Sequence, residues 1–124
     1  MVYLDTHLVL WLYAGSLDLI SKKVLQVLDE DDLYISPIVA LELQYLKEIK
    51  KIKKSSSEII DALHKEINLK ICEKDFYSII KESMGTRWTR DPFDRIIVAH
   101  AAFNKNALLT KDDAMRAHYK QTIW

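Results

Sequence analysis

The sequence contains little of what marks several common classes of protein. Two glycines and two prolines in 124 residues are too few for a loop-rich or disordered chain. No apolar run approaches the about 20 residues that cross a membrane, and the first residues lack the basic and apolar regions of a signal peptide. The single cysteine, Cys72, has no partner for an intrachain disulfide. We therefore expect a protein of the reducing cytoplasm, with Cys72 as a small buried residue in a strand rather than a nucleophile.

An excess of charge of one sign is also missing. The 18 basic and 18 acidic residues give a formal charge of zero, so the chain lacks the overall basic charge that attracts nucleic acids. If several of the acids bind a metal ion, the remaining residues have a positive net charge. The 49% of hydrophobic residues are ordinary for a globular protein, and the length allows one core. We expect a single domain over residues 1–124.

Short apolar segments alternate with helical patterns along the chain. Ser36-Pro37 and Asp91-Pro92 each combine an N-cap residue with a proline at the first helical position, and each predicts the start of a helix. Helices are predicted at about 8–13, 22–29, 37–49, 58–66, 74–83, 92–104 and 111–118. Strands are predicted at 2–4, 33–35, 69–71, 107–110 and 122–124. This alternation predicts an α/β fold with a mostly parallel sheet of four or five strands.

Two aspartates follow predicted strands. Asp5 closes the first strand, and Asp112 lies just beyond the fourth. Sites in open parallel sheets form outside the carboxyl ends of the strands, so both side chains are expected at the same edge. Aspartate is also a common turn or cap residue after a strand, so neither position alone decides for a site.

Glu42 and Asp94 occupy predicted helix faces that should be buried. The helical neighbours of Glu42 are all apolar or aromatic: Ile38, Tyr45, Leu46 and Ile49. Asp94 begins a face that continues with Ile97, Val98 and Ala101, whereas Asp91 stands where the N-cap belongs. An unpaired buried carboxylate costs several kcal/mol, so each acid needs a cation, hydrogen-bond donors or a proton. A glutamate at the edge of the apolar face that pairs with a nearby lysine or arginine is the alternative for Glu42.

Four separate segments thus each supply one carboxylate. Oxygen ligands are those that Mg²⁺ and Mn²⁺ prefer, and such a site can hydrolyse a phosphodiester bond with metal-bound water. Other kinds of site lack their motifs. The four histidines have no zinc spacing, and the chain contains neither a glycine-rich phosphate loop nor a G-x-S-x-G elbow. His7 follows Asp5 closely, and we expect a local structural role for it.

Several segments resemble the PIN-domain family. Tyr3-Leu4-Asp5-Thr6-His7 is similar to the opening strand of these domains, and Ser36 followed by Glu42 resembles their second-strand serine and helix glutamate. The most specific segment, Arg90-Asp91-Pro92-Phe93-Asp94-Arg95, is very similar to the R-D-P-F-D-R motif of a VapC-like subgroup. Leu108-Leu109-Thr110-Lys111-Asp112 resembles L-x-T-x-D, and the order and spacing agree over nearly the whole chain. Trp88-Thr89 departs from close relatives, which often carry histidine before the arginine.

The resemblance implies a Rossmann-like α/β/α sandwich and cleavage of RNA with Mg²⁺ or Mn²⁺. It also implies the toxin role in a toxin–antitoxin pair, a cognate antitoxin and usually a homodimer. By position, Asp5, Glu42, Asp94 and Asp112 are the catalytic and metal-binding acids. Residues expected to support them or to contact substrate are Thr6, Ser36, Asp91, Arg95, Thr110 and Asp113, the last of which is an alternative to Asp112 as the fourth acid.

Two other interpretations remain open at this point. The fold could serve as a non-catalytic interaction module, although the presence of all four acids argues against this. A phosphatase-like phosphoryl-transfer domain would need a second aspartate at position 7, where the chain has His7. The lysine-rich segment 47–54 could attract RNA or an acidic partner, but a solvated helix end explains it equally well.

Overall fold

The fold is built around a five-stranded, all-parallel sheet with the strand order β3-β2-β1-β4-β5. The computed structural model describes all residues, 1–124. The strands are short: β1 (Val2–Leu4), β2 (Leu33–Ile35), β3 (Lys70–Ile71), β4 (Ala107–Leu109) and β5 (Thr122–Ile123). The predicted parallel sheet is confirmed, and so is its fifth strand near the end of the chain. β1 occupies the centre, where it pairs with β2 on one side and with β4 on the other.

Seven α-helices connect these strands. They are α1 (Thr6–Ala14), α2 (Lys22–Glu30), α3 (Pro37–Glu48), α4 (Ser56–Ile67), α5 (Phe76–Ser83), α6 (Pro92–Ala102) and α7 (Asp113–His118), with a short 3-10 helix at Leu17–Leu19. Ser36 and Asp91 cap α3 and α6 as predicted, each followed by proline at the first helical position. None of the helices combines the length and the apolar character needed to span a bilayer.

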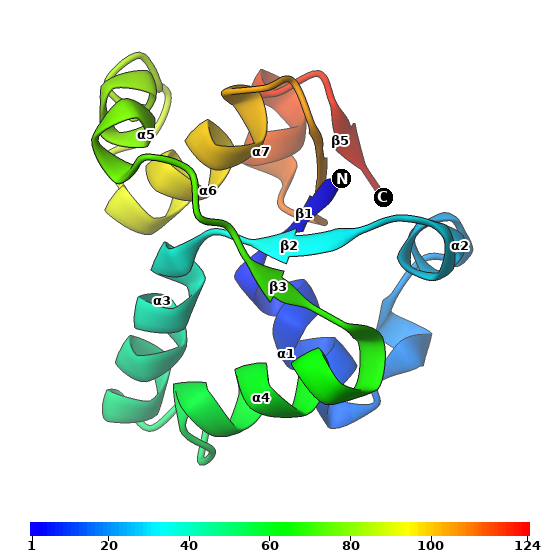
Figure 1. Cartoon of the computed structure of the whole chain (residues 1–124). Helices are drawn as coiled ribbons and strands as arrows, with labels where there is room; N and C mark the ends of the chain where they lie inside the picture. Colours follow the sequence, from blue (N-terminus) through cyan, green and yellow to red (C-terminus); the bar gives the residue numbers. More distant parts are fainter.

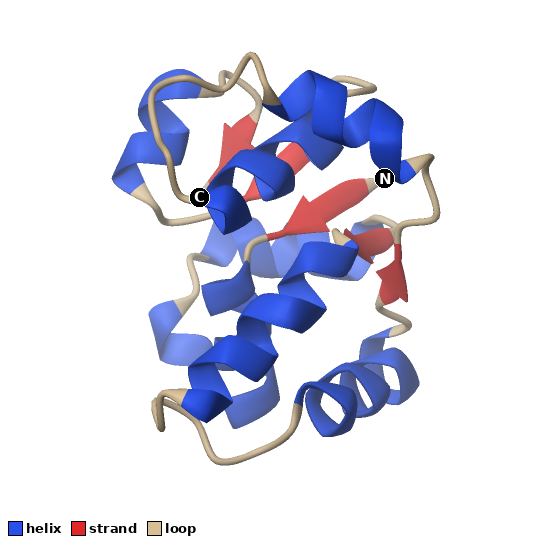
Figure 2. Ribbon diagram, turned by 90° about the vertical axis from the view of Figure 1, so that its left-hand side faces the viewer, coloured by secondary structure: helices blue, strands red, loops and turns tan.

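The helices cover the sheet on both faces. α1, α3 and α4 lie on one side, and α5, α6 and α7 lie on the other (Figure 1). The view turned by 90° shows the strands between these two groups of helices (Figure 2). Right-handed crossovers explain the division, because the chain moves outward from β1 to β3 and then returns past β1 to β4 and β5. The predicted three-layer α/β/α architecture is confirmed.

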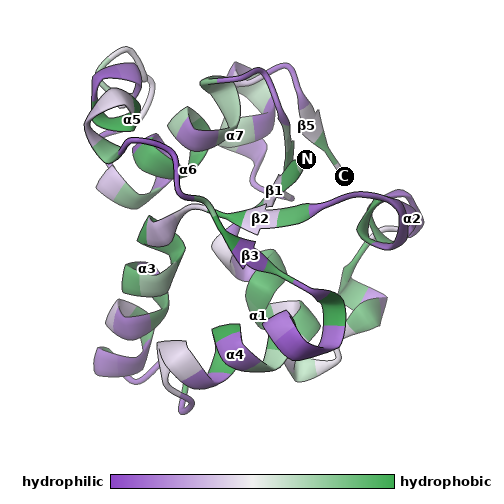
Figure 3. Cartoon of the chain, in the orientation of Figure 1, coloured by the Kyte–Doolittle hydropathy of each residue, from purple (hydrophilic) through white to green (hydrophobic).

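The core lies between the sheet and the two helical layers. Strand residues such as Tyr3, Leu4, Ile35, Leu108 and Leu109 are 0–1% exposed, because a strand of a parallel sheet is covered on both faces. The hydropathy colouring shows apolar positions in the interior and hydrophilic positions on the outward sides of the helices and in the edge strand β3 (Figure 3). The apolar character of the inner strands β1, β2 and β4 thus follows from this double coverage, whereas the edge strands β3 and β5 each begin with a polar residue.

The face that α3 buries differs from the predicted one. The fully buried residues are Val39 and Leu43, whereas Tyr45 is 46% exposed and Ile49 is 43% exposed. Apolar residues occur on nearly every side of this helix, so its periodicity does not select one face. Glu42 therefore lies beside the buried face, half-buried at its edge, and not within it.

Candidate active site

Asp5 lies directly after the central strand β1, at the carboxyl edge of the sheet. Its side chain is 6% exposed and caps the N-terminus of α1. Oδ1 accepts a hydrogen bond from the Thr6 backbone N–H at 2.7 Å, and Oδ2 accepts one from the Thr110 hydroxyl at 2.7 Å. Burial raises the pKa of the Asp5 carboxyl, and these two hydrogen bonds oppose the rise in part. The carboxylate is therefore held in place by α1 and by the residue that follows β4.

Glu42 is connected to Asp5 through Thr6. The Thr6 hydroxyl donates a hydrogen bond to Glu42 Oε1 at 2.5 Å, which joins the first residue of α1 to the second turn of α3. Thr6 itself is fully buried. Burial raises the pKa of Glu42, the hydrogen bond from Thr6 lowers it, and the nearby charge of Asp5 raises it again. The structure thus places Glu42 at the same edge of the sheet as Asp5.

Asp94 projects from the first turn of α6. Asp91 caps this helix, because its Oδ1 accepts hydrogen bonds from the backbone N–H groups of Phe93 at 2.8 Å and Asp94 at 3.2 Å. As predicted, Asp91 and not Asp94 is the N-cap of α6. Ile97 and Val98, which follow on the same side of the helix, are buried, so Asp94 stands half-buried where the core meets the site.

Asp112 is joined to the same group by Thr110. The Thr110 hydroxyl accepts a hydrogen bond from the Asp112 backbone N–H at 3.0 Å while it donates to Asp5. Asp112 caps α7 by accepting from the Met115 N–H at 2.8 Å. Its charge also raises the pKa of Asp5 and of Asp94. The hydrogen bonds through Thr110 favour Asp112 over Asp113 as the fourth acid, although the side chain of Asp112 is exposed.

The carboxylates of the other acids act electrostatically on Asp94. Its pKa is raised from 3.8 to about 7. Burial is the largest cause, followed by the charges of the carboxylates of Asp91, Asp5, Asp112 and Glu42. Like charges that share a small region disfavour ionisation of one another. Acids from four different elements therefore act on one another at the carboxyl edge of the sheet.

No basic side chain neutralises these acids. The one salt bridge in the chain joins Lys54 to Glu58, on the surface of α4 and the loop before it. Pairing of Glu42 with a lysine or arginine, which the sequence left open, does not occur. The concentration of negative charge therefore calls for a cation from outside the chain or for protonation of at least one carboxyl group.

The donor groups fit a hard divalent cation. Carboxylate oxygens are the ligands that Mg²⁺ and Mn²⁺ prefer, and Mg²⁺ commonly binds through one or two carboxylates while it keeps several waters. No three histidine, cysteine, aspartate or glutamate side chains stand close enough together to enclose a metal ion in their present conformations. The acids thus form an open, negatively charged edge rather than a closed cage.

Ser36 contacts residues of α3 and α6 and none of the four acids. Its hydroxyl accepts a hydrogen bond from the Ile38 N–H at 3.3 Å and lies 2.8 Å from Nδ1 of the buried His100. This pair joins the N-terminus of α3 to the last turn of α6, the helices that carry Glu42 and Asp94. The role of Ser36 in the structure is therefore to fix the relative position of two site helices.

Arg95 follows Asp94 on α6, and its side chain contacts the end of α5. Its Nε and Nη2 atoms donate to the Ser83 carbonyl at 3.2 Å, and Nη2 also donates to the Met84 carbonyl at 3.3 Å. These carbonyl groups belong to the C-terminus of α5, where a cation is favoured by the helix dipole. In this structure the guanidinium group of Arg95 joins α6 to α5, and a contact of Arg95 with substrate stays a prediction.

His7 is a site neighbour that the sequence argument assigned to a local structural role. It is exposed, and its charge lowers the pKa of both Asp5 and Glu42. The sequence shows only that His7 follows Asp5 closely. Its effect on Glu42 depends on the packing of α1 against α3, which brings Thr6 to Glu42 and has no local signal.

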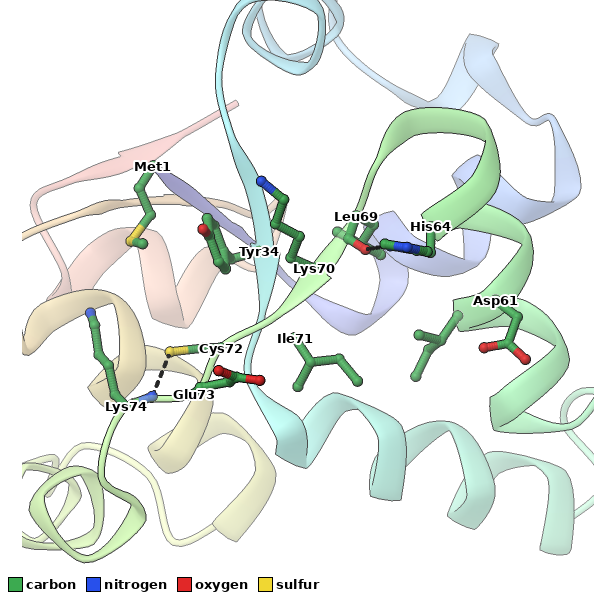
Figure 4. A pocket seen from close by; sticks show the side chains of 11 residues that line it. Met1, Tyr34, Asp61, His64, Leu69, Lys70, Ile71, Cys72, Glu73 and Lys74 are labelled. Atoms are coloured by element: carbon green, nitrogen blue, oxygen red, sulfur yellow. Dashed lines mark hydrogen bonds between the residues drawn. The ribbon is translucent and has the colours of Figure 1, made fainter.

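A larger pocket lies elsewhere. It measures about 620 Å³ and borders the outer strand β3, between α4 and the segment that leads to α5 (Figure 4). His64 in its wall is bonded to the Leu69 carbonyl group, and Cys72 accepts a hydrogen bond from Tyr3 at 3.1 Å. None of the four acids lines this cavity. A smaller cleft of about 230 Å³ borders Asp5 and Asp112.

Comparison with known proteins agrees with this arrangement. The sequence model of the family described as "PIN domain" matches residues 2–121. The chain belongs to the PIN-domain family. Membership indicates a hydrolase that acts on nucleic acid, and PIN domains generally use divalent metal ions. The comparison with curated proteins found no match.

Two solved structures contain chains with the same fold as this PIN domain. One is a toxin–antitoxin complex from Klebsiella pneumoniae, with 19% identity and a TM-score of 0.70 over 100% of this chain and 97% of that chain. The other is VapBC2 from Rickettsia felis bound to a DNA fragment from their promoter, with 20% identity and a TM-score of 0.60 over 99% of this chain and 96% of that chain. At these identities the likeness establishes the fold alone.

Proposed function

We propose that this PIN domain is a metal-dependent endoribonuclease and the toxin of a toxin–antitoxin pair. The observation that carries the proposal is the grouping of Asp5, Glu42, Asp94 and Asp112 at one sheet edge without a basic partner. Such a grouping is costly for folding unless a cation balances it. A functional requirement for that cation gives a physical reason for keeping the acids together.

Mg²⁺ or Mn²⁺ is the proposed cation, and the four acids are its proposed ligands. When bound, it would supply activated water and neutralise charge that develops on phosphate oxygens. The chain contributes fixed acceptor groups: Thr110 holds one oxygen of Asp5, and Thr6 orients Glu42. Asp94 and Asp112 are set by the helix N-termini from which they project. Metal binding would also keep Asp94 ionised at neutral pH.

Two observations support the proposal that RNA is the substrate and an antitoxin is the partner. The R-D-P-F-D-R segment of residues 90–95 is the most specific part of the resemblance to VapC-like toxins. The chains of similar fold come from a toxin–antitoxin complex and from VapBC2. A homodimer is proposed on the resemblance alone.

Substitution of single site acids tests the proposal. We expect Asp5→Asn and Asp94→Asn each to reduce RNA cleavage in Mg²⁺ or Mn²⁺ by more than the about 10–100-fold that loss of a supporting residue costs at a metal site. Both changes preserve size, and asparagine can still cap a helix, so the fold should persist. Cleavage of a labelled single-stranded RNA by purified protein is the measurement, with circular dichroism to check folding.

Neighbouring aspartates on α7 provide a matched control. Asp112→Asn should lose activity, whereas Asp113→Asn should retain it, because Asp112 is joined to Asp5 through Thr110 and no hydrogen bond links Asp113 to the site. Full cleavage by folded Asp5→Asn and Asp94→Asn, with contaminating nuclease excluded, would contradict the proposal. Wild-type protein that binds Mn²⁺ but cleaves no RNA would favour a non-catalytic module.

A further inference from the structure

The cleft beside Asp5 and Asp112 is also lined by residues to which the proposed metal site gives no function. It measures about 230 Å³ and lies between the N-terminal half of α1 and the turn from β4 to α7. Beyond the two acids, its lining residues are His7, Leu8, Trp11 and Lys111. An aromatic and basic surface therefore adjoins the proposed catalytic edge directly.

Trp11 forms a firm aromatic surface in this cleft. It lies three and four residues after Leu8 and His7, so all three share one side of α1. The indole ring of Trp124 meets it edge-on, with ring centroids 5.7 Å apart at 61°, and the His7 ring lies 6.2 Å away at 47°. Trp11 also packs against the core and is only half-buried. Its ring is thus held by neighbours while part of it borders the cleft.

Lys111 supplies a cation that the chain does not neutralise. Its Nζ lies 5.9 Å from the centre of the Trp11 ring, at the outer limit of a cation–π contact, and the side chain is exposed. It forms no salt bridge, even though Asp112 is its neighbour in sequence. Such a weakly held ammonium group can move from the indole ring to a ligand at little cost.

The charge and size of the cleft select the kind of group that it can hold. On its acidic side, the proposed cation at Asp5 and Asp112 would hold the cleaved phosphate, whereas the apolar and aromatic walls from Leu8 and Trp11 suit a flat, uncharged ring. The volume is below the about 300–1,000 Å³ of pockets for drug-sized ligands, which suits one ring system. Lys111 at the border is placed for the phosphate that follows such a ring. Proteins commonly bind unpaired bases in single-stranded RNA by stacking on aromatic side chains.

We propose that this cleft is a nucleobase subsite, in which an unpaired base next to the cleaved phosphate stacks on Trp11 while Lys111 binds the adjoining phosphate. The proposal rests on the proposed ribonuclease function and specifies how that site holds its substrate. The ligand class is a single-stranded RNA segment. A double-stranded RNA keeps its bases stacked on one another and does not fit.

Affinity for a short single-stranded RNA tests the role of Trp11 without any cleavage. In the Asp94→Asn background, we expect Trp11→Leu to weaken binding by about fivefold or more, the loss typical of one base–aromatic stack. Trp11→Phe should retain most of the affinity, because phenylalanine also offers an aromatic face. Fluorescence anisotropy with a labelled RNA measures both, and thermal unfolding checks that each variant is folded.

The chain provides a matched control on α5. Lys81 Nζ lies 5.1 Å from the centre of the exposed Tyr77 ring, a similar pair on another helix with none of the site acids beside it. Tyr77→Leu should leave RNA affinity unchanged. Equal affinity of the folded Trp11→Leu variant and its parent would overturn the subsite, as would equal losses in Trp11→Leu and Tyr77→Leu.

Salt dependence tests Lys111 separately. If Lys111 binds one phosphate, Lys111→Gln should reduce the slope of log affinity against log salt concentration by about 0.7, the value for one contact with a single strand. Lys81→Gln should leave the slope unchanged. An unchanged slope in Lys111→Gln would overturn the phosphate contact.

Kinetics distinguish failure of the subsite from failure of the proposed function. In the otherwise wild-type enzyme, Trp11→Leu should raise KM with little change in kcat, because stacking is present before and during the reaction. Cleavage by the wild type with unchanged KM in Trp11→Leu would overturn the subsite alone. Binding that depends on Trp11, in a wild-type protein that cleaves no RNA, would support the base site and contradict the ribonuclease proposal.

Discussion

The raised pKa of Asp94 makes the stability of the fold depend on pH. Burial and the surrounding carboxylates raise its pKa to about 7, so the folded protein holds a proton there that the unfolded chain releases near pH 4. The folded state is therefore favoured by this group below pH 4, and the advantage is lost as the pH rises from about 4 to 7. Without a bound cation, ionisation of Asp94 destabilises the protein at neutral and alkaline pH.

Replacement of Asp94 by asparagine should reverse this loss in metal-free protein. We expect Asp94→Asn to raise the free energy of unfolding by about 1–2 kcal/mol at pH 8, after allowance for solvent screening of a half-buried group. The gain should grow with pH between about 4 and 7 and then become constant. Urea unfolding in the presence of a chelator, at several pH values, measures it. Asp113→Asn, at an exposed position, should show no such trend, and a gain for Asp94→Asn that does not change with pH would contradict the assignment.

At the scale of elements, the end of α1 depends on one glycine. Gly15 caps this helix in the left-handed conformation, with φ +72°, and its N–H bonds to the Leu12 carbonyl group. A side chain at this position would meet no neighbouring atom, so the cost of substitution is conformational and not steric. The chain can thus leave α1 sharply towards the 3-10 helix.

Gly15→Ala should lower the free energy of unfolding by about 1 kcal/mol, because alanine is strained in the left-handed region. The other glycine, Gly85, does not have a left-handed φ, and an added Cβ would make only ordinary contact at 3.5 Å. Gly85→Ala should therefore be neutral or slightly stabilising, since it restricts the unfolded chain. Equal effects of the two substitutions on urea unfolding would contradict this account.

Local signals in the sequence were enough to predict most elements. Capping residues and prolines at Ser36-Pro37 and Asp91-Pro92 predicted the starts of α3 and α6, and short apolar runs predicted all five strands. The buried face of α3 was mispredicted because apolar residues surround the helix, so only the neighbouring elements select Val39 and Leu43. The order of the strands likewise depends on long-range packing and not on local pattern.

The candidate site was predictable in part for a related reason. The four acids could be named, because an acid after a strand or at the border of an apolar helix face stands out locally. The hydrogen bonds that hold them could not, since Thr6 meets Glu42 and Thr110 meets Asp5 only after the elements pack. The same limit explains Arg95, whose contacts with Ser83 and Met84 lie on another helix and have no sequence signal.

At the scale of the whole molecule, a divalent cation should stabilise the fold. The acids repel one another at one edge of the sheet, and a ligand that binds only the folded state raises stability by mass action. At a concentration of Mn²⁺ about 100 times the dissociation constant, we expect a gain of about 2.7 kcal/mol, seen as a higher Tm. Asp5→Asn should lose most of this response, whereas Asp61→Asn, an exposed substitution on α4, should keep it. A Tm that does not depend on Mn²⁺ in the wild type would contradict a specific site.

The pairing of β1 with β4 has a consequence for synthesis of the chain. A ribosome synthesises the chain from its N-terminus, so Asp5 is made long before Thr110 and Asp112, with which it forms the site. Until the last of these has been made, β1 lacks one of its two neighbours in the sheet, and the acidic edge is incomplete. A nascent or prematurely terminated chain therefore has no assembled acidic edge, and any activity of that edge begins only when synthesis is nearly complete.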